Sequence, residues 1–187
     1  RRPPRSTPFP TRRSSDLPKP VISLTRDIHF EESIDMIKLQ GKKDNDRIIN
    51  VLEFLNTNNN FSYVKDDIDY MLELDPNPLS SFVFLFKQKN TDRICCIITA
   101  TMKHPTMFID MIEVRKTKRN QSIAKNCLAM LLHKEHITNI KGQILNDKNA
   151  IKFWASINVL PRSNNLSYNA RHFDTNITTT IKGDPHD

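Results

Sequence analysis

The sequence predicts an α/β (α+β) fold, in which a mixed sheet starts as an antiparallel meander and becomes parallel through one β-α-β crossover. Two observations lead to this prediction. Three β-forming runs follow one another with only short polar links between them, at 81–88, 93–103 and 107–114. The third run leads into an apolar-periodic stretch at about 121–135, and another β-forming run follows. Such a crossover normally makes its two strands parallel and right-handed.

The length and charge of the chain favour one soluble domain. With 187 residues, the chain can bury a sizeable core. The formal net charge is +7, but residues 1–17 hold five Arg and one Asp and so carry +4 of it. This leader resembles a translated sequencing-adapter artefact and lacks apolar periodicity, so we expect it to be disordered; a basic nucleic-acid-binding arm is the alternative. We expect a single domain over 18–187.

The apolar runs and the cysteines indicate a protein of a reducing compartment. No run approaches the roughly 20 residues of a membrane span, and no signal-peptide pattern is visible, so we expect a cytoplasmic protein with no membrane partner. Cys95 and Cys96 are adjacent in an apolar run, which favours buried thiols over a disulfide. His133 and His136 could ligate a metal, but histidines near a helix C-terminus also suit the helix dipole. We expect no metal.

The first half of the chain contains a strand, two helices and a hairpin. The run VISLT, 21–25, suits a strand. Apolar residues recur at helical spacing over 44–57 and again over 64–72, and Pro76 and Pro78 end the second helix. The next two β-forming runs are separated by only Lys-Asn-Thr-Asp, which predicts an antiparallel hairpin.

The second half alternates strands and helices. A strand is expected at 139–145 and a helix at 147–157. The last thirty residues could hold two more strands, around the runs YNARHF and NITTTI. Helical spacing places these side chains on core-facing sides: Ile123, Cys127, Met130 and Leu131 in the first helix, and Ala150, Ile151, Trp154 and Ile157 in the second.

The stretch EVRKTKRNQSIAK, 113–125, is a candidate anion site. It joins the strand 107–114 to the following helix, and a helix N-terminus presents unpaired N–H groups and the positive end of the helix dipole. Four cations come just before that terminus, namely Arg115, Lys116, Lys118 and Arg119. Cations and oriented amides together suit a pyrophosphate. A basic, solvated loop before a core helix is the alternative interpretation.

These residues carry a resemblance to a known family. MFIDMIEVRKTKRNQSIAKNCLAMLL resembles the fourth strand, phosphate loop and third helix of the GNAT superfamily of acyl-CoA-dependent N-acyltransferases. The family pattern Arg/Gln-x-x-Gly-x-Gly/Ala falls on the residues Arg119, Asn120, Gln121, Ser122, Ile123 and Ala124. NAIKFWASINV resembles the family's later helix, and the order of elements agrees from about residue 20 to 160. The resemblance implies a GNAT-like mixed sheet, acetyl-CoA as co-substrate and an amine-bearing small molecule or protein as acceptor; a homodimer is compatible with it.

The sequence departs from the family pattern at several positions. Asn120 and Ser122 stand where the family has glycines, which permit a positive φ and a close approach to phosphate. Asn is the best substitute for glycine in that conformation, although a strained non-Gly position costs about 1–3 kcal/mol. Asp147 stands where the family usually has Asn, and Asn158-Val159 replaces its usual Gly-Phe.

The resemblance also assigns contacts to the cofactor. Backbone groups of Ile112, Glu113 and Val114 would pair with the pantetheine arm, where the two parallel strands splay. The remaining expected contacts come from the loop and from the later helix: Arg119, Asn120, Gln121, Ser122, Ile123, Ala124 and Asn149.

Two carboxylates compete for the role of general base. Many family members carry a carboxylate four residues before the strand-ending Val, and here that residue is Asp110. Alternation along a strand puts Asp110 on one face with Phe108, Ile112 and Val114, and puts Glu113, the second choice, on the other face. A solvated or salt-bridged strand carboxylate is the alternative for either residue.

The general acid is harder to identify. The usual helix tyrosine corresponds to Trp154, and an indole N–H can donate a hydrogen bond but cannot deliver a proton to a thiolate. Tyr168 or solvent could replace it, and core packing explains Trp154 equally well.

Three functions remain open from the sequence. The first is an acyl-CoA-dependent N-acyltransferase that transfers acetyl to a primary amine. The second is a catalytically weak or inactive member of the same fold that binds acyl-CoA or a protein partner. The third is a basic nucleic-acid-binding domain, suggested by RKTKR, although the sequence shows no interleaved aromatics and no RNA-binding motif.

Overall fold

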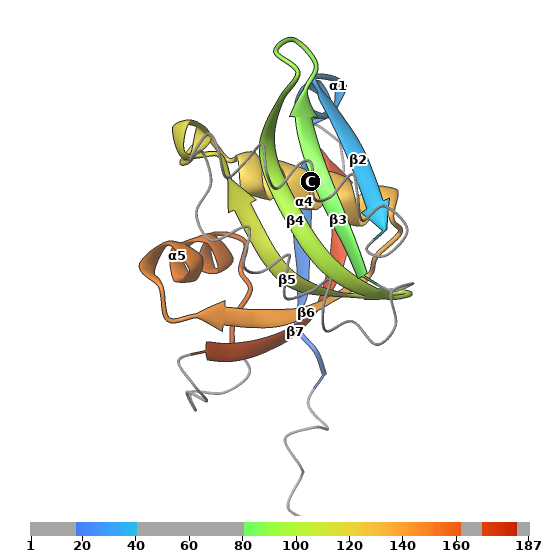
Figure 1. Ribbon diagram of the computed structural model, residues 1–187. Coiled ribbons are helices and arrows are strands. Elements are labelled where there is room, and N and C mark those ends of the chain that lie inside the picture. The colour runs from blue at the N-terminus through green and yellow to red at the C-terminus, as the bar shows by residue number, and fades with distance from the viewer. Residues whose placement is uncertain (1–17, 41–80, 162–169, 183–187) are drawn as a thin grey trace, which may run out of the picture.

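The computed structural model describes residues 18–40, 81–161 and 170–182 (Figure 1). The helices predicted at 44–57 and 64–72 lie outside the described residues. The described elements are β1 (Val21–Arg26), α1 (Ile28–Glu32), β2 (Ile34–Gln40), β3 (Ser81–Gln88), β4 (Arg93–Lys103), β5 (Thr106–Val114), the 3₁₀ turn η2 (Lys116–Lys118), α4 (Ile123–Lys134), β6 (Asn139–Leu145), α5 (Lys148–Ser156) and β7 (Ala170–Ile181).

The seven described strands form one mixed sheet in the order β1-β7-β6-β5-β4-β3-β2. The predicted hairpin β3–β4 and the predicted pairing of β4 with β5 are both antiparallel, as expected. The predicted crossover is also confirmed, because β5 and β6 are parallel on either side of α4. The strand at 21–25 exists as β1, but it lies at the far edge of the sheet, parallel to β7.

The first strand of the meander is an element that the sequence did not predict. β2 pairs antiparallel with β3, from Ile34 opposite Gln88 to Gln40 opposite Phe82. It follows the one-turn helix α1, which Asp27 caps by accepting a hydrogen bond from the backbone N–H of Phe30. Lys38 and Asp35 interrupt the apolar pattern of β2, and its register therefore comes from pairing with the apolar β3.

The prediction of two strands in the last thirty residues is wrong for the described part. β7 is one strand that pairs antiparallel with β6 through its first half and parallel with β1 through its second half. The polar residues that suggested a break, Asp174 and Asn176, lie inside the strand. Both accept hydrogen bonds from the buried Asn139 side chain, at 2.9 and 3.1 Å. These bonds compensate for the polar residues, so the strand continues.

The core lies between the sheet and α4, which passes behind β3 and β4 in Figure 1. The residues predicted to face the core from this helix, Ile123, Cys127, Met130 and Leu131, are all buried. Burying such side chains contributes about 1.5–3 kcal/mol each. The three cysteines are buried free thiols, as expected. Among the described residues, no helix has the length and apolar composition of a membrane span.

The helix α5 packs over β6. Trp154 is 6% exposed and packs against Phe173 with ring centroids 4.5 Å apart. Phe173 lies opposite Gly142 in the β6–β7 ladder. Ile157 is buried as predicted, but Ile151 is 46% exposed, so its predicted core position is wrong. The reason is that the packing of α5 on the sheet centres on Trp154 and does not extend over the end of β6.

We predict that Gly142→Ala destabilises the fold by about 1–3 kcal/mol, because overpacking a filled core is costly. A Cβ at this position would lie 2.7 Å from Cζ of Phe173 and 3.0 Å from the backbone oxygen of Ile109. The free energy of unfolding from urea denaturation measures the change. The neighbouring Gln143→Ala is the control, because Gln143 is exposed and its loss should cost less than about 0.5 kcal/mol. Equal losses for the two variants would contradict the packing argument.

Candidate active site

The two parallel strands separate in the middle of the sheet. β5 pairs with β6 only from Thr106 opposite Asn139 to Ile109 opposite Gly142, although β5 continues to Val114. A register shift in the β4–β5 ladder lies at the same place, because Thr99 pairs with Met111 and Ala100 with Ile109. The extra residue is Asp110. A bulge of this kind bends its strand and raises the local twist, which accounts for the separation.

The bulge overturns the predicted alternation along β5. Before it, Phe108 lies opposite Thr101; after it, Ile112 lies opposite Ile98 and Val114 opposite Cys96. Ile98 and Cys96 belong to the core, and Ile112 and Val114 pack against that core. Ile112 and Val114 therefore face α4, while Phe108 faces the other side of the sheet. The extra residue shifts the period of two by one position.

The loop after β5 has the backbone conformation of a glycine loop without containing glycine. Asn120 has φ of 62° and Ser122 has φ of 56°, both in the left-handed region. The resemblance assigns family glycines to both positions, and Ser122 is the first glycine of the family pattern. Asn visits this region more readily than most residues, and Ser is small. The replacement of glycine by Asn120 and Ser122 therefore does not remove the left-handed conformation from the loop.

The N-terminus of α4 presents unpaired donors beside this loop. Its first backbone bond of the α-helical type joins the N–H of Asn126 to the carbonyl of Ser122 at 3.0 Å. The N–H groups of Ile123, Ala124 and Lys125 come before that bond and have no partner in the helix. Because Ser122 is left-handed, it makes no side-chain cap. The donors therefore remain available to an anion, which the positive end of the helix dipole also favours.

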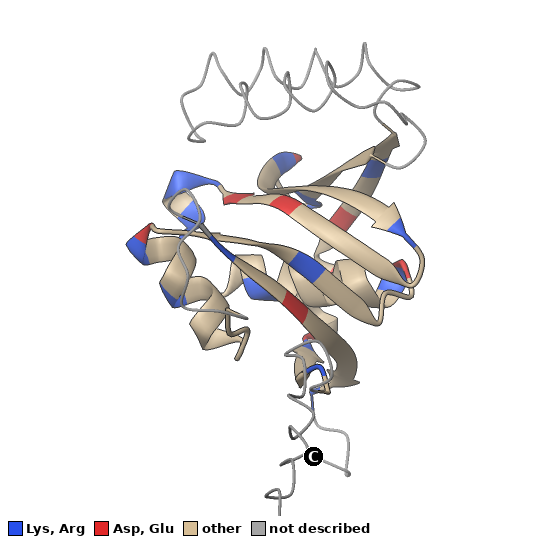
Figure 2. Ribbon diagram, turned by 90° about the horizontal axis from the view of Figure 1, so that it is seen from below, with Lys and Arg blue, Asp and Glu red and all other residues tan. Residues whose placement is uncertain are grey.

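The four cations before the helix do not act as one group. Arg115 is 8% exposed, and its Nε donates to the carbonyl of Ile94 at 2.6 Å. Burial, together with the charge of Arg93, lowers the pKa of this guanidinium from its ordinary value. The inclusion of Arg115 among the anion-binding cations is therefore wrong: it joins the loop to β4. In Figure 2, the basic loop after β5 forms a blue corner of the molecule.

Arg119 is held by the end of β5. Its Nη2 lies 2.5 Å from Oε1 of Glu113, and its Nε donates to the carbonyl of Val114 at 3.2 Å. Glu113 is therefore a salt-bridged strand carboxylate, which was one of the alternatives to its role as the general base. The pair fixes the direction in which the chain leaves the strand. Of the cations before the helix, Lys116 is exposed and Lys118 is half-buried.

The beginning of α5 contributes a different arrangement. Asp147 accepts hydrogen bonds from the N–H groups of Asn149 and Ala150, at 2.9 and 3.0 Å, and so caps the helix. Asn149 is exposed on its first turn. After the helix, Asn158 has φ of 60° and Val159 is buried. Asn158 stands where the family has a third glycine, and again the left-handed conformation is kept.

Of the two candidate general acids, only Trp154 lies among the described residues. Trp154 is a buried packing residue, in line with the core interpretation of this side chain. Tyr168 lies outside the described residues. Asp110 itself is exposed in the bulge. Among the described residues, no group of three or more His, Cys, Asp and Glu side chains has the geometry of a metal site.

The sequence analysis missed a buried carboxylate close to this region. Asp174 is 8% exposed and lies opposite Lys141, which lies opposite Phe108 in turn. Burial opposes its ionisation, but the hydrogen bond from Asn139 and the charges of Lys19 and Lys141 outweigh that effect and lower the pKa of Asp174. The signal in the sequence was an aspartate in the middle of a β-forming run, because an acidic side chain there is buried only when it has partners.

Comparison with known proteins identifies the fold. No known family profile and no curated protein sequence matches the chain. Solved structures do match. An acetyltransferase of the GNAT family from Desulfovibrio desulfuricans has a TM-score of 0.54 and 9% identity, over 75% of this chain and 96% of that one. PaiA N-acetyltransferase from Thermoplasma acidophilum, in complex with coenzyme A, has a TM-score of 0.50 and 11% identity, over 77% and 99%.

A third match is a variant of spermidine N-acetyltransferase from Vibrio cholerae, with a TM-score of 0.50 and 12% identity over 78% of this chain and 94% of that one. Identities this low carry information about the fold alone. The predicted fold class is confirmed: the chain has the mixed α/β fold of the GNAT superfamily.

Proposed function

We propose that the chain is an acyl-CoA-dependent N-acetyltransferase that transfers an acetyl group to a primary amine. One observation carries the proposal: Asn120 and Ser122 keep the left-handed conformation beside an uncapped helix N-terminus. A strained backbone persists only where the surrounding structure enforces it, and it clusters at ligand sites. The fold and the coenzyme A named for one structural neighbour support the same assignment.

The residues present fit a pyrophosphate. The first-turn N–H groups of α4 would donate to its oxygens, with Lys116 and Lys118 as nearby cations. The edge of β5 beyond Ile109, which β6 no longer pairs, would hold the amide-bearing pantetheine arm through backbone groups of Ile112, Glu113 and Val114. Asn149 would contact the same arm from the first turn of α5.

The thioester of the bound co-substrate would supply the electrophilic carbonyl. Asp110 would take the proton that the attacking amine loses, directly or through a water, because it is exposed at the point where the strands separate. Glu113 is a weaker candidate, because Arg119 already holds its carboxylate. Tyr168 is the protein group proposed to return a proton to the departing thiolate, and solvent is the alternative.

An amine acceptor fits the superfamily, and one structural neighbour is named for spermidine. We place this activity in a single domain over 18–187. A cytoplasmic location belongs to the same proposal.

A second candidate function has an observation of its own. Trp154, at the position of the family's tyrosine, is packed on Phe173 and takes no part in proton transfer. A protein that binds acyl-CoA without turnover would show calorimetric binding of acetyl-CoA, and no thiol release with any amine.

The first prediction concerns binding. Acetyl-CoA and CoA should bind the full-length protein more tightly than ATP in calorimetric titrations, since ATP lacks the pantetheine arm. Ser122→Val should weaken acetyl-CoA binding at least about tenfold, or about 1.4 kcal/mol, because a β-branched residue resists a positive φ. Thr117→Val, in the exposed turn η2, is the matched control. Unchanged binding in the Ser122 variant would argue against the loop as the cradle.

The second prediction concerns strain. Ser122→Gly should raise the free energy of unfolding by up to about 1 kcal/mol, since glycine adopts a positive φ without steric cost. Ser156→Gly, the same change at the end of a helix, should lower it by about 0.5–1 kcal/mol. Urea denaturation measures both changes. Two shifts of the same sign would rule out strain at Ser122 as the cause.

The third prediction concerns catalysis. Asp110→Asn should lower kcat about 10²–10⁴-fold, the usual contribution of a general base, while acetyl-CoA binding stays the same. Thiol release would be measured with the best acceptor from a panel of spermidine, a lysine peptide and an aminoglycoside. Glu113→Gln should affect acetyl-CoA binding more than kcat, because its partner Arg119 belongs to the loop. If Asp110→Asn keeps full activity, Asp110 is not the base.

A further inference from the structure

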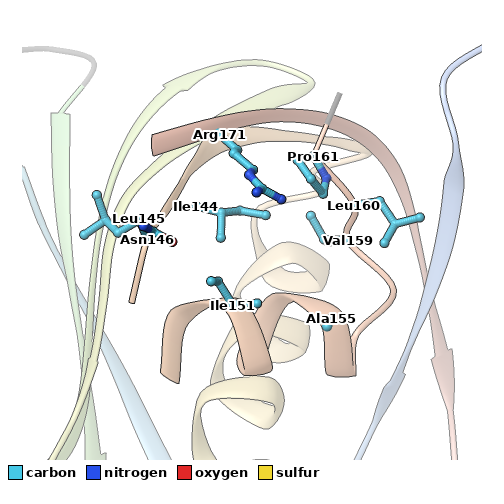
Figure 3. Close-up of a pocket in the computed structure, with 9 residues that line it drawn as sticks. All are labelled: Ile144, Leu145, Asn146, Ile151, Ala155, Val159, Leu160, Pro161 and Arg171. Atoms are coloured by element: carbon cyan, nitrogen blue, oxygen red, sulfur yellow. The ribbon is translucent and has the colours of Figure 1, made fainter. Parts of the chain in front are cut away.

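A pocket of about 150 Å³ opens where β6 ends, beside α5 and the start of β7 (Figure 3). None of its residues is a candidate cofactor contact. Its lining is apolar except for one amide and one guanidinium: Ile144, Leu145, Asn146, Ile151, Ala155, Val159, Leu160, Pro161 and Arg171.

The pocket exists because the packing of α5 on the sheet changes between two neighbouring positions on the same face of the β6–β7 ladder. At Gly142 and Phe173, the large ring of Trp154 fills the space. Two residues further along, Ile144 lies opposite Arg171, and the helix offers only the methyl group of Ala155 and the side chain of Ile151. The volume next to Ile144 therefore stays open.

The apolar surface around this volume is poorly covered. Leu145, Ile151 and Leu160 are 59%, 46% and 66% exposed, and they are three of the large apolar side chains that the described residues expose. Leaving a Leu or Ile side chain in water forgoes up to about 1.5–3 kcal/mol of burial. A gathering of such residues around one hollow indicates a surface that a ligand covers.

Among the described residues that line the pocket, Arg171 is the one with a charged side chain. Figure 3 shows its guanidinium reaching from β7 over Ile144, beside Pro161. Among the described residues, it has no hydrogen-bond or ion-pair partner. A guanidinium presents a planar fork of donors that matches a carboxylate in a bidentate arrangement, and apolar surroundings strengthen such a pair.

We propose that this pocket binds a small apolar carboxylate of about the size of benzoate. The carboxylate pairs with Arg171, and the apolar body of the ligand fills the space over Ile144 against Ile151 and Ala155. A dry aliphatic cavity of about 150 Å³ is large enough for a benzene-sized group. No residue of the loop before α4 lines the pocket, and the proposal does not rest on the proposed acetyltransferase function.

The test is a calorimetric titration of benzoate into the full-length protein, with benzyl alcohol as a neutral ligand carrying the same ring. Benzoate should bind saturably at one site, and Arg171→Met should weaken it about tenfold to hundredfold, the usual worth of a hydrogen bond to a charged group. Lys152→Gln is the matched control, because it removes an exposed cation of α5 outside the pocket and should leave the affinity unchanged.

Two further variants keep the proposal falsifiable. Arg171→Lys, which keeps the charge and loses the fork, should retain part of the affinity. Ala155→Leu, which fills the pocket from an exposed helix position, should abolish binding with Arg171 intact. The proposal fails if benzoate does not saturate at any soluble concentration, if benzyl alcohol binds equally well, or if Arg171→Met and Lys152→Gln behave alike.

Discussion

The end of the pairing between β5 and β6 is the constraint on which the candidate site depends. A parallel pair normally continues until one of its strands ends, but here it stops at Ile109 and Gly142 while both strands continue. The bulge at Asp110 lies one residue beyond the last pair. Gly142 allows the closest approach of the two backbones, because a side chain there would meet both Phe173 and the carbonyl of Ile109. Close pairing before that point and separation after it together form the gap.

The second constraint is conformational, and a chain poor in glycine meets it in an unusual way. The whole sequence has only 3 glycines, yet three residues to which the resemblance assigns a family glycine are left-handed: Asn120, Ser122 and Asn158. Each has a small polar side chain, the type that tolerates this region best after glycine. Two of them border α4 and the third follows α5, so the geometry of both helix ends is kept at some cost in strain.

Most of the fold could be predicted from local patterns, and the failures have identifiable physical causes. The hairpin, the crossover and the core side of α4 follow from periodicity and short links, which are properties of neighbouring residues. β2 and the continuous β7 could not be predicted in this way, because both owe their form to a partner strand far away in the sequence. The polar residues in β7 looked like a break only because Asn139, which bonds them, lies on another strand.

The candidate site was predictable as a segment and not as a set of side-chain directions. The resemblance located the loop, and Asn120 and Ser122 have the left-handed conformation that suits glycine. The predicted faces of β5 were wrong because one inserted residue reverses the alternation of side chains along a strand. The residues around Asp110 give no sign of that insertion in the sequence. Arg115 was misassigned because a cation in a basic run gives no sign that it will turn inward to a carbonyl of β4.

The helix α5 contributes residues to both proposed sites. The first turn of α5 carries the exposed Asn149, a proposed cofactor contact, while Trp154 packs the helix on the sheet through Phe173. One residue beyond Trp154, Ala155 is too small to fill the space over Ile144. Because aromatic packing anchors the helix in between, the cavity beside it can stay open while the core remains closed. A well-packed anchor next to a small residue is thus enough to create a pocket, and Arg171, which has no ion-pair partner among the described residues, is the group proposed to give that pocket its preference for an anion.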